Sequence, residues 1–508
     1  MSPDEEVSVT AIAERKVQPA VSSFISSPRK MLINGTWVDA ASGRTFPTYD
    51  PATGEKICEV AHGEAEDINR AVAAARAAFE DGPWSRMTPA ERQVIVWRIG
   101  DLLAERAEEF AQLEAIDNGK SATVAQFVDI AWSVEIFRYY AGWCTKIEGR
   151  TITPSVPWAP GAQWHAYTLR EPVGVCGQII PWNFPLLMAA FKLGPALCTG
   201  NTIVLKPAEQ TPLTALLLGE LMMEAGVPPG VVNIVPGFGD AGAALAAHDG
   251  VDKVAFTGST EVGKLVVQAA SGNLKKVTLE LGGKSPNIVF ADADLEAAIA
   301  GSANAWLFNS GQCCVAGTRM FVEDTIFDEF TASVAEFASK VKVGPGLDPA
   351  TQLGPLVSQE QFDRVTGFLA QGERDGSRAL TGGARIGDRG YFVEPTVLVD
   401  VREDMSVVQE EIFGPVVVAM PFSGSDLGPV AEANRSAYGL ASGIWTRDIS
   451  KAHRVARQIK AGNVWVNCYN AFDTAIPFGG YKQSGWGREL GAEAIDFYAQ
   501  TKAVNVSL

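Results

Sequence analysis

Hydrophobic residues between positions 174 and 281 fall into short β-rich runs that alternate with helical stretches. The runs read GVCGQII, NTIVLK, VVNIV, KVAFT and KVTLEL, and stretches such as PLTALLLGELMMEAG separate them. This alternation predicts a parallel, doubly wound α/β sheet, whose ligands bind beyond the carboxyl ends of the strands. Each run leads into a distinctive loop (PWNFP, KPAEQTP, PGFGD, TGSTEVG or GGKSP), so we expect a nucleotide site at that edge.

The segments on either side of this unit have patterns of their own. Before it, apolar residues at helical spacing predict helices over DINRAVAAARAAFE, over residues 89–110 and over residues 123–143. The second helix follows a capping box that starts at Thr88. Residues 149–170 suggest two extended strands joined by a proline-rich turn. After Gly283 a second α/β unit begins, with strands such as NIVF and RMFVED.

Composition and charge narrow the class of protein. At 508 residues, two or three domains are expected. The net charge of −17 argues against nucleic acid or an anionic membrane as a partner. Seven cysteines without a CxxC motif indicate a reducing, cytoplasmic setting and no metal site. Neither a signal peptide nor a membrane span is expected, because no apolar run is long enough.

The stretch FNSGQCCVAGTR is the leading candidate for chemistry. It places Cys313 and Cys314 in a glycine-punctuated turn, where one of them could act as a nucleophile or both could be small buried residues. The histidines lie in settings that do not indicate an active-site loop (His62, His165, His248 and His453). Glu280 is a better candidate for the base because it ends a strand-like run before two glycines. Its alternative role is a polar strand end paired with Lys284.

These motifs resemble the aldehyde dehydrogenase superfamily. VTLELGGKSPNIVF is followed by FNSGQCC, and the likeness extends from LINGTWVDA to PFGGYKQSGWGREL. The resemblance implies that Cys314 is the nucleophile and that Glu280 is the general base that hydrolyses a thioester. It also implies that the Asn183 side chain and the cysteine N–H stabilise the oxyanion.

The resemblance also implies that NAD is the cofactor. Residues 237–242 match the GxGxxG motif of dinucleotide-binding proteins. The family, however, binds the pyrophosphate near the loop that holds Ser259. The GxGxxG residues would therefore have only a minor role, near the adenine. Lys206 and Glu209 would hold the adenosine ribose, and the Glu209 carboxylate would favour NAD over NADP. Glu411 would bind the nicotinamide ribose. The remaining expected cofactor residues are Ile180, Pro181, Trp182, Gly239, Gly258, Leu281 and Phe413.

The resemblance further implies an apolar substrate tunnel. Its walls would be Phe184, Met188, Phe191, Phe308, Cys313, Phe472 and Phe478, with Trp132 near the mouth. Because none of these side chains is charged, we expect an apolar, aromatic aldehyde of the phenylacetaldehyde kind. The tail VNCYNAFDTAIPFGGYKQSGWGREL also resembles that of phenylacetaldehyde dehydrogenases.

The sequence leaves three alternative functions. They are a broad-specificity aliphatic or betaine aldehyde dehydrogenase, a coenzyme A-acylating semialdehyde dehydrogenase and an inactive structural or binding protein on the same fold. Glu280 argues against a coenzyme A-acylating enzyme. The presence of Cys314, Glu280 and Asn183 together argues against an inactive protein.

The expected organisation has four parts and a homo-tetramer or homodimer. The parts are an N-terminal arm (1–30), an NAD-binding domain (31–148 and 171–282), oligomerisation segments (149–170 and 484–508) and a catalytic domain (283–483).

Overall fold

The computed structural model describes residues 17–508. Most of the expected N-terminal arm lies outside this range. Its described part contains one short helix, α1 (Pro19–Ile25).

The first sheet is the predicted parallel, doubly wound sheet. Its eight strands run in the order β19-β11-β10-β7-β8-β9-β1-β2. The five expected strands form its parallel centre: β7 (Val175–Ile179), β8 (Thr202–Lys206), β9 (Val232–Ile234), β10 (Lys253–Thr257) and β11 (Lys276–Glu280). Antiparallel strands complete the edges: the hairpin β1 (Met31–Ile33) and β2 (Thr36–Val38) at one end, and β19 (Gly485–Trp486) at the other.

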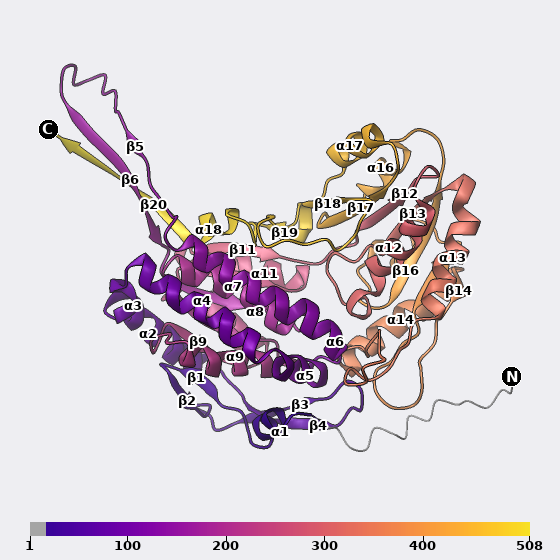
Figure 1. Ribbon diagram of the computed structural model, residues 1–508, viewed down its shortest axis with the longest axis horizontal. Coiled ribbons are helices and arrows are strands. Elements are labelled where there is room, and N and C mark those ends of the chain that lie inside the picture. Colours follow the sequence, from indigo (N-terminus) through magenta and orange to yellow (C-terminus); the bar gives the residue numbers. More distant parts are fainter. Residues whose placement is uncertain (1–16) are drawn as a thin grey trace.

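Helices cover both faces of this sheet, and alternate strand residues face opposite cores (Figure 1). Val204 of β8 packs in one core, whereas its neighbours Ile203 and Leu205 pack in the other. The first core holds α2 (Ala65–Glu80), α10 (Gly239–Ala247) and α11 (Thr260–Ala270). The second holds α4 (Pro89–Glu105), α5 (Ala107–Asp117), α7 (Ala131–Trp143), α8 (Pro185–Cys198) and α9 (Leu213–Glu224).

Two of the expected helices are interrupted. The helix expected over 89–110 divides at Arg106, whose φ of −105° and ψ of 18° end α4, and α5 begins at the next residue. The helix expected over 123–143 opens with α6 (Ala122–Val124) and the π-helical segment η2 (Ala125–Ile130) before α7 starts. The π segment carries Asp129, whose buried carboxylate lies 2.6 Å from the Lys120 Nζ. π-helical turns are rare and occur frequently at functional sites.

The second α/β unit is also confirmed. Its seven strands run in the order β14-β15-β16-β13-β12-β17-β18 and are parallel except for β14. They are β12 (Pro286–Val289), β13 (Arg319–Glu323), β14 (Arg378–Thr381), β15 (Thr396–Val399), β16 (Val416–Phe422), β17 (Ala441–Trp445) and β18 (Asn463–Val466). The principal helices are α12 (Leu295–Leu307), α13 (Phe327–Ser339), α14 (Gln359–Asp375) and α17 (Ile449–Gln458).

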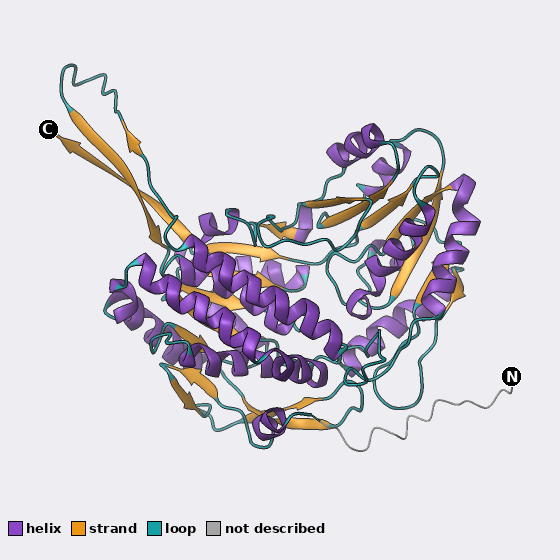
Figure 2. Cartoon of the chain, in the orientation of Figure 1, coloured by secondary structure: helices purple, strands orange, loops and turns teal. Residues whose placement is uncertain are grey.

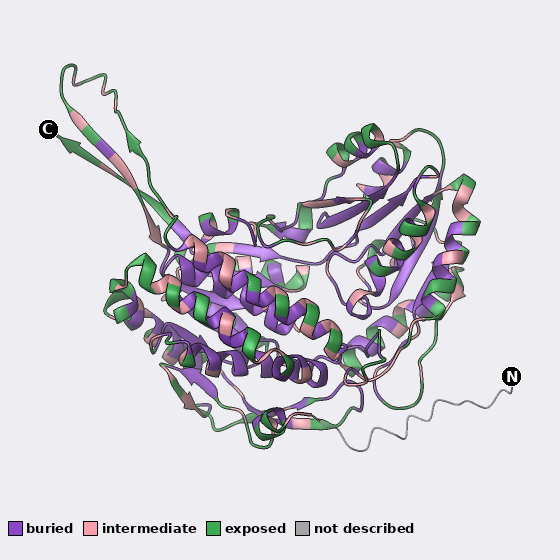
Figure 3. Ribbon diagram, viewed as in Figure 1, coloured by how far each residue is buried: buried purple, intermediate pink, exposed green. Residues whose placement is uncertain are grey.

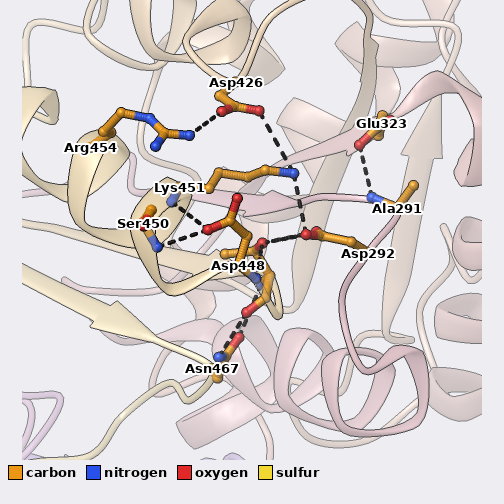
Figure 4. Close-up of polar contacts among 10 residues, drawn as sticks. Ala291, Asp292, Glu323, Asp426, Asp448, Ser450, Lys451, Arg454 and Asn467 are labelled. Carbon is orange, nitrogen blue, oxygen red and sulfur yellow. Dashed lines mark hydrogen bonds and ion pairs between the residues drawn. The ribbon is translucent and has the colours of Figure 1, made fainter.

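Charged side chains connect α17 with the loops at the carboxyl ends of β12 and β16. Lys451 lies 3.3 Å from Asp292 and 3.7 Å from Asp426, and Arg454 contacts Asp426 as well (Figure 4). Because these charges are paired with one another, the cluster holds loops together and leaves no open site.

A three-stranded antiparallel arm projects from the body of the molecule (Figures 1 and 2). It consists of β5 (Thr151–Ile152), β6 (Trp164–Pro172) and β20 (Ala499–Ser507). The strands expected within 149–170 are thus present, and the C-terminus supplies the third. Most of the arm is exposed, in contrast to the buried central strands (Figure 3).

The joint between the arm and the first sheet is short. Only Val173 and Gly174 separate β6 from β7. Gly174 has a φ of +130°, and a Cβ there would lie 2.0 Å from the Asp252 Oδ2. That oxygen accepts hydrogen bonds from the Val175 N–H (2.7 Å) and from the Arg76 guanidinium (2.6 Å).

The other segment expected to serve in oligomerisation, 484–508, is divided between two places. β19 joins the first sheet and α18 (Glu493–Tyr498) packs on α8, so only β20 belongs to the arm. No helix within residues 17–508 is long and apolar enough to cross a membrane.

Candidate active site

A tight turn at the end of α12 presents the two adjacent cysteines. Asn309, Ser310 and Gly311 have φ values of 52°, 57° and 70°, so three successive residues are left-handed. A Cβ at Gly311 would lie 2.0 Å from the Gly414 carbonyl oxygen, which leaves room only for glycine. The turn reverses the chain and places Cys313 and Cys314 on the wall of a cavity.

This cavity has a volume of about 720 Å³ and is lined by residues from both α/β units. Most of the expected site residues line it: Trp132, Pro181, Trp182, Asn183, Phe184, Met188, Phe191, Gly258, Ser259, Glu280, Leu281, Phe308, Cys313, Cys314, Glu411, Phe413, Phe472 and Phe478. Four expected cofactor residues are not part of this lining: Ile180, Lys206, Glu209 and Gly239.

Hydrogen bonds fix the loop after β7 against the cysteine turn. The Asn183 Nδ2 donates to the Gln312 carbonyl (3.0 Å), and the Asn309 Nδ2 donates to the Asn183 carbonyl (2.8 Å). One N–H of the Asn183 amide is therefore left for a ligand. The Cys314 backbone N–H has no acceptor among residues 17–508. Sequence reasoning missed Asn309, although asparagine is one of the few residue types that adopt left-handed φ readily.

The Cys314 thiol is half-buried beside the thiol of Cys313. A hydrogen bond with the Cys313 side chain, burial and the neighbouring carboxyl groups raise the pKa of Cys314 well above its usual value. Near neutral pH the thiol form of Cys314 is therefore favoured over the thiolate.

Glu280 ends β11 and is buried at the cavity wall. Burial is the main cause that raises the pKa of Glu280 well above its usual value, and the nearby Glu489 carboxyl group raises it further. Lys192 forms an ion pair with Glu489 and donates to the Thr257 hydroxyl (2.7 Å). The alternative pairing of Glu280 with Lys284 is wrong, because the Lys284 ammonium donates to the Val407 carbonyl at 2.7 Å.

Lys192 and Glu489 were not expected in the site. A lysine within the apolar stretch LLMAAFKLGPAL was the available signal, since a buried ammonium requires a partner.

A second carboxyl group, Glu411, also lines the cavity. Its Oε1 accepts a hydrogen bond from the Gly283 N–H (2.8 Å), and burial raises the pKa of Glu411 to about 7. A Cβ at Gly282 would lie 2.4 Å from the Glu411 Oε2, so glycine is required for this approach.

The groups expected to bind a dinucleotide lie along the carboxyl edge of the first sheet. Lys206 ends β8, and its Nζ lies 3.2 Å from the Glu209 Oε2. Burial lowers the pKa of Lys206, and the adjacent carboxylate opposes this shift. Ser259 caps α11, because its Oγ accepts from the Val262 N–H at 3.2 Å. A lysine–carboxylate pair suits a ribose diol, and a helix N-terminus suits a phosphate.

Comparison with known proteins identifies the family. The model of the aldehyde dehydrogenase family matches residues 37–504. The chain belongs to the aldehyde dehydrogenase family. It is therefore an oxidoreductase that acts on the aldehyde group.

Several characterised relatives are similar over nearly their full length. The mitochondrial benzaldehyde dehydrogenase of Antirrhinum majus is 51% identical over 98% of this chain and 92% of its own. The aldehyde dehydrogenase of Bacillus cereus, solved as an NAD+ complex, is 51% identical, with a TM-score of 0.94 over 97% of this chain and 99% of its own. The indole-3-acetaldehyde dehydrogenase AldA of P. syringae, solved with NAD+ and IAA, is 44% identical, with a TM-score of 0.91 over 94% and 96%.

In this aldehyde dehydrogenase, aromatic rings line the cavity together with Cys314. Phe184 and Phe308 stack with their centroids 5.6 Å apart and their planes at 23°. Trp132 stacks on Phe472 at 5.0 Å and meets the edge of Phe191 at 5.1 Å. Phe478 lies 6.1 Å from Phe472 and 6.2 Å from Phe191, which completes the aromatic wall.

Proposed function

We propose that the enzyme oxidises an apolar, aromatic aldehyde of the phenylacetaldehyde kind to its carboxylic acid. NAD is its cofactor. The aromatic wall around Cys314 is the observation that carries the substrate class. Aromatic pairs contribute about 0.5–1.5 kcal/mol each beyond the burial of their surface. Every residue of this wall is uncharged, so an aryl group fits it better than a charged one does.

In the first step the Cys314 sulfur attacks the aldehyde carbon after its proton has passed to solvent. A C–S bond forms, and negative charge develops on the former carbonyl oxygen. The free N–H of the Asn183 amide and the Cys314 backbone N–H would donate to this oxygen. Fixed donors of this kind lower the barrier because they require no reorganisation during the reaction.

The second step forms a thioester on Cys314, and the third hydrolyses it. When bound, NAD supplies the acceptor for the hydride that leaves the substrate carbon. The Glu280 carboxylate then takes a proton from water, whose oxygen attacks the thioester carbon and releases the Cys314 thiolate. The raised pKa of Glu280 makes it a stronger base than an exposed carboxylate.

The carboxyl edge of the first sheet would hold NAD. Lys206 and Glu209 would bind the adenosine ribose, and the N-terminus of α11 at Gly258 and Ser259 would bind the pyrophosphate. The Glu209 carboxylate favours NAD over NADP because it repels a 2′-phosphate. Glu411 would hold the nicotinamide ribose. The other proposed contacts are Ile180, Pro181, Trp182, Gly239, Leu281 and Phe413.

The printed names of two relatives support an aromatic substrate. One relative is a benzaldehyde dehydrogenase, and the other is an indole-3-acetaldehyde dehydrogenase.

The substrate class is tested by kcat/KM for phenylacetaldehyde, benzaldehyde, hexanal, acetaldehyde and betaine aldehyde under one set of conditions. Phenylacetaldehyde should exceed acetaldehyde by about one to three orders of magnitude, because two or three additional ring contacts form. A ranking with acetaldehyde or betaine aldehyde first would refute the proposal.

We also propose the domain boundaries given by the sequence, a homo-tetramer or homodimer assembled through the arm, and a cytoplasmic location. The seven free cysteines support a reducing compartment.

A further inference from the structure

A buried turn between α5 and α6 contacts the loop that carries Asn183. It consists of residues 118–120, none of which lines the cavity or has a role in the proposed mechanism. The turn contacts Trp182 on one side of Asn183 and Phe184 on the other. It therefore holds both neighbours of the residue whose amide would bind the oxyanion.

Asn118 holds the first neighbour through its side-chain amide. Its Nδ2 donates to the Trp182 carbonyl at 2.8 Å, and its Oδ1 accepts from the Lys120 N–H at 3.3 Å. These two bonds determine the orientation of the amide, since the opposite orientation would place acceptor against acceptor and donor against donor. The Thr211 hydroxyl also donates to the Trp182 carbonyl, at a longer 3.4 Å. Asn118 is thus the principal donor to the backbone that leads into Asn183.

Lys120 holds the second neighbour through its ammonium group, which is almost completely buried. The Nζ lies 4.2 Å from the centroid of the Phe184 ring. A cation over an aromatic face is attracted to it, and the attraction is stronger where water is excluded. The ammonium itself is fixed by Asp129 at 2.6 Å and by Glu114 at 3.2 Å. Phe184 is therefore attached to a group whose own position is fixed.

The turn is anchored on both α/β units. The Asp117 Oδ2, at the end of α5, accepts from the Leu213 N–H of the first unit at 2.9 Å. From the second unit, Gly346 and Gly354 pack so closely that a Cβ on either would lie 2.2 Å from a carbonyl oxygen of the turn. Because the turn is held from both sides, it can in turn hold the loop that it contacts.

We propose that Asn118 and Lys120 are positioning residues that hold Asn183 where its free amide N–H meets the developing oxyanion. Neither residue touches the substrate, and each acts through the neighbour of Asn183 that it contacts. This inference rests on the proposed function, because it requires Asn183 as an oxyanion donor. A misplacement of about 1 Å at a reacting group can cost about a hundredfold in rate, so small displacements of this loop matter.

A double-mutant cycle with Asn183 tests the proposal. Asn183→Ala should lower kcat/KM by about two to three orders of magnitude, the usual effect of losing one oxyanion donor. In the wild-type background, Asn118→Ala should lower kcat/KM by about ten- to a hundredfold. In the Asn183→Ala background the same substitution should have almost no effect, because the group that Asn118 positions is absent.

Lys120 requires a paired substitution. Lys120→Met alone would leave the Asp129 carboxylate buried without its partner, which destabilises a fold. Lys120→Met combined with Asp129→Asn removes both charges. Glu114 stays largely neutral at neutral pH, because burial raises its pKa to about 8. This double variant should also lower kcat/KM in the wild-type background and have almost no effect in the Asn183→Ala background.

For each variant, kcat/KM is measured with acetaldehyde as well as with phenylacetaldehyde. Both substrates form the oxyanion, whereas only the aromatic one should respond to a change confined to the Phe184 ring. Alkylation of Cys314 by iodoacetamide displaces iodide and forms no oxyanion. The fraction of Cys314 that reacts therefore counts the correctly folded sites in each preparation.

Lys253→Met is the matched control. Lys253 is also buried, donates to the Thr278 hydroxyl at 2.8 Å and lies 4.7 Å from the Tyr498 ring, but it does not line the cavity. Lys253→Met should change kcat/KM by the same factor in the wild-type and Asn183→Ala backgrounds.

A loss that is equally large in both backgrounds, a loss confined to phenylacetaldehyde, or no loss at all would overturn the assignment of the residue concerned. An unchanged kcat/KM in Asn183→Ala would instead overturn the proposed oxyanion role of Asn183 itself.

Discussion

At the scale of single residues, the two adjacent thiols have different surroundings and different proposed roles. Cys313 is buried, whereas Cys314 is half-buried and is the proposed nucleophile. The hydrogen bond with Cys313 is the largest cause of the raised pKa of Cys314. Cys313 therefore affects the reactivity of its neighbour.

Substitution of each cysteine separates these roles. Cys314→Ala should reduce dehydrogenase activity by at least about three orders of magnitude, because the nucleophile is lost. Cys313→Ala should stay active, and its lower Cys314 pKa should move the alkylation of Cys314 by iodoacetamide to lower pH. Peptide mass spectrometry at a series of pH values measures this shift. If Cys313→Ala were inactive and Cys314→Ala active, the assignment would be reversed.

The Glu280 carboxyl group predicts the direction of a pH dependence. Thioester hydrolysis needs its ionised form, so the rate of this step should rise as pH increases through the raised pKa. Glu489→Gln removes a negative charge that raises this pKa and releases Lys192, whose positive charge lowers it. The rising part of the profile should therefore move to lower pH, as measured by rapid-quench decay of the acyl-enzyme.

Glu280→Gln is the control for this pH experiment. It should abolish the rising part and give a burst of about one equivalent of NADH before slow turnover. A profile of Glu489→Gln that is unchanged or moved to higher pH would contradict the proposed coupling.

At the scale of elements, the sequence predicted the strands well because local signals mark each of them. The five central strands are short β-rich runs that end in loops with glycine or proline. The break at Arg106 and the π segment before α7 carry no such signal, since apolar spacing continues through both. The π segment carries Asp129, whose ion pair with Lys120 is a contact that the spacing of apolar residues does not encode.

In the candidate site, too, only residues that lie in local sequence motifs could be predicted. Cys314, Glu280 and Asn183 could be named because they lie in local motifs. Lys192 and Glu489 meet across 297 positions of sequence, and neither lies in a motif that indicates the other.

At the scale of the whole molecule, one face of the arm carries a mixture of apolar and basic side chains. The register of β6 and β20 places Leu169, Tyr167, Val504 and Val506 on this face, with Lys502 opposite Leu169 and His165 opposite Val506. Leu169 and Val506 are 41% and 39% exposed, so this face is available to a second subunit.

Charges introduced on that face should weaken assembly. Leu169→Lys combined with Val506→Lys should lower the mass measured by light scattering relative to wild type, because burial of two ammonium groups is unfavourable. Wild type should be a dimer or a tetramer at the same concentration. A monomeric wild type, or a double variant of unchanged mass, would contradict the proposed role of the arm.

The glycine joint at the base of the arm has a mechanical consequence. Gly174 is packed against the Asp252 carboxylate, which also holds the next backbone N–H and is itself held by Arg76. We therefore expect this joint to resist bending, so that a displacement of the arm would pass along β7 towards the loop that carries Asn183. Contact between the arm and a neighbouring subunit would thus influence the position of the reacting carbonyl oxygen. The stiff backbone of this joint and of β7 would connect the two.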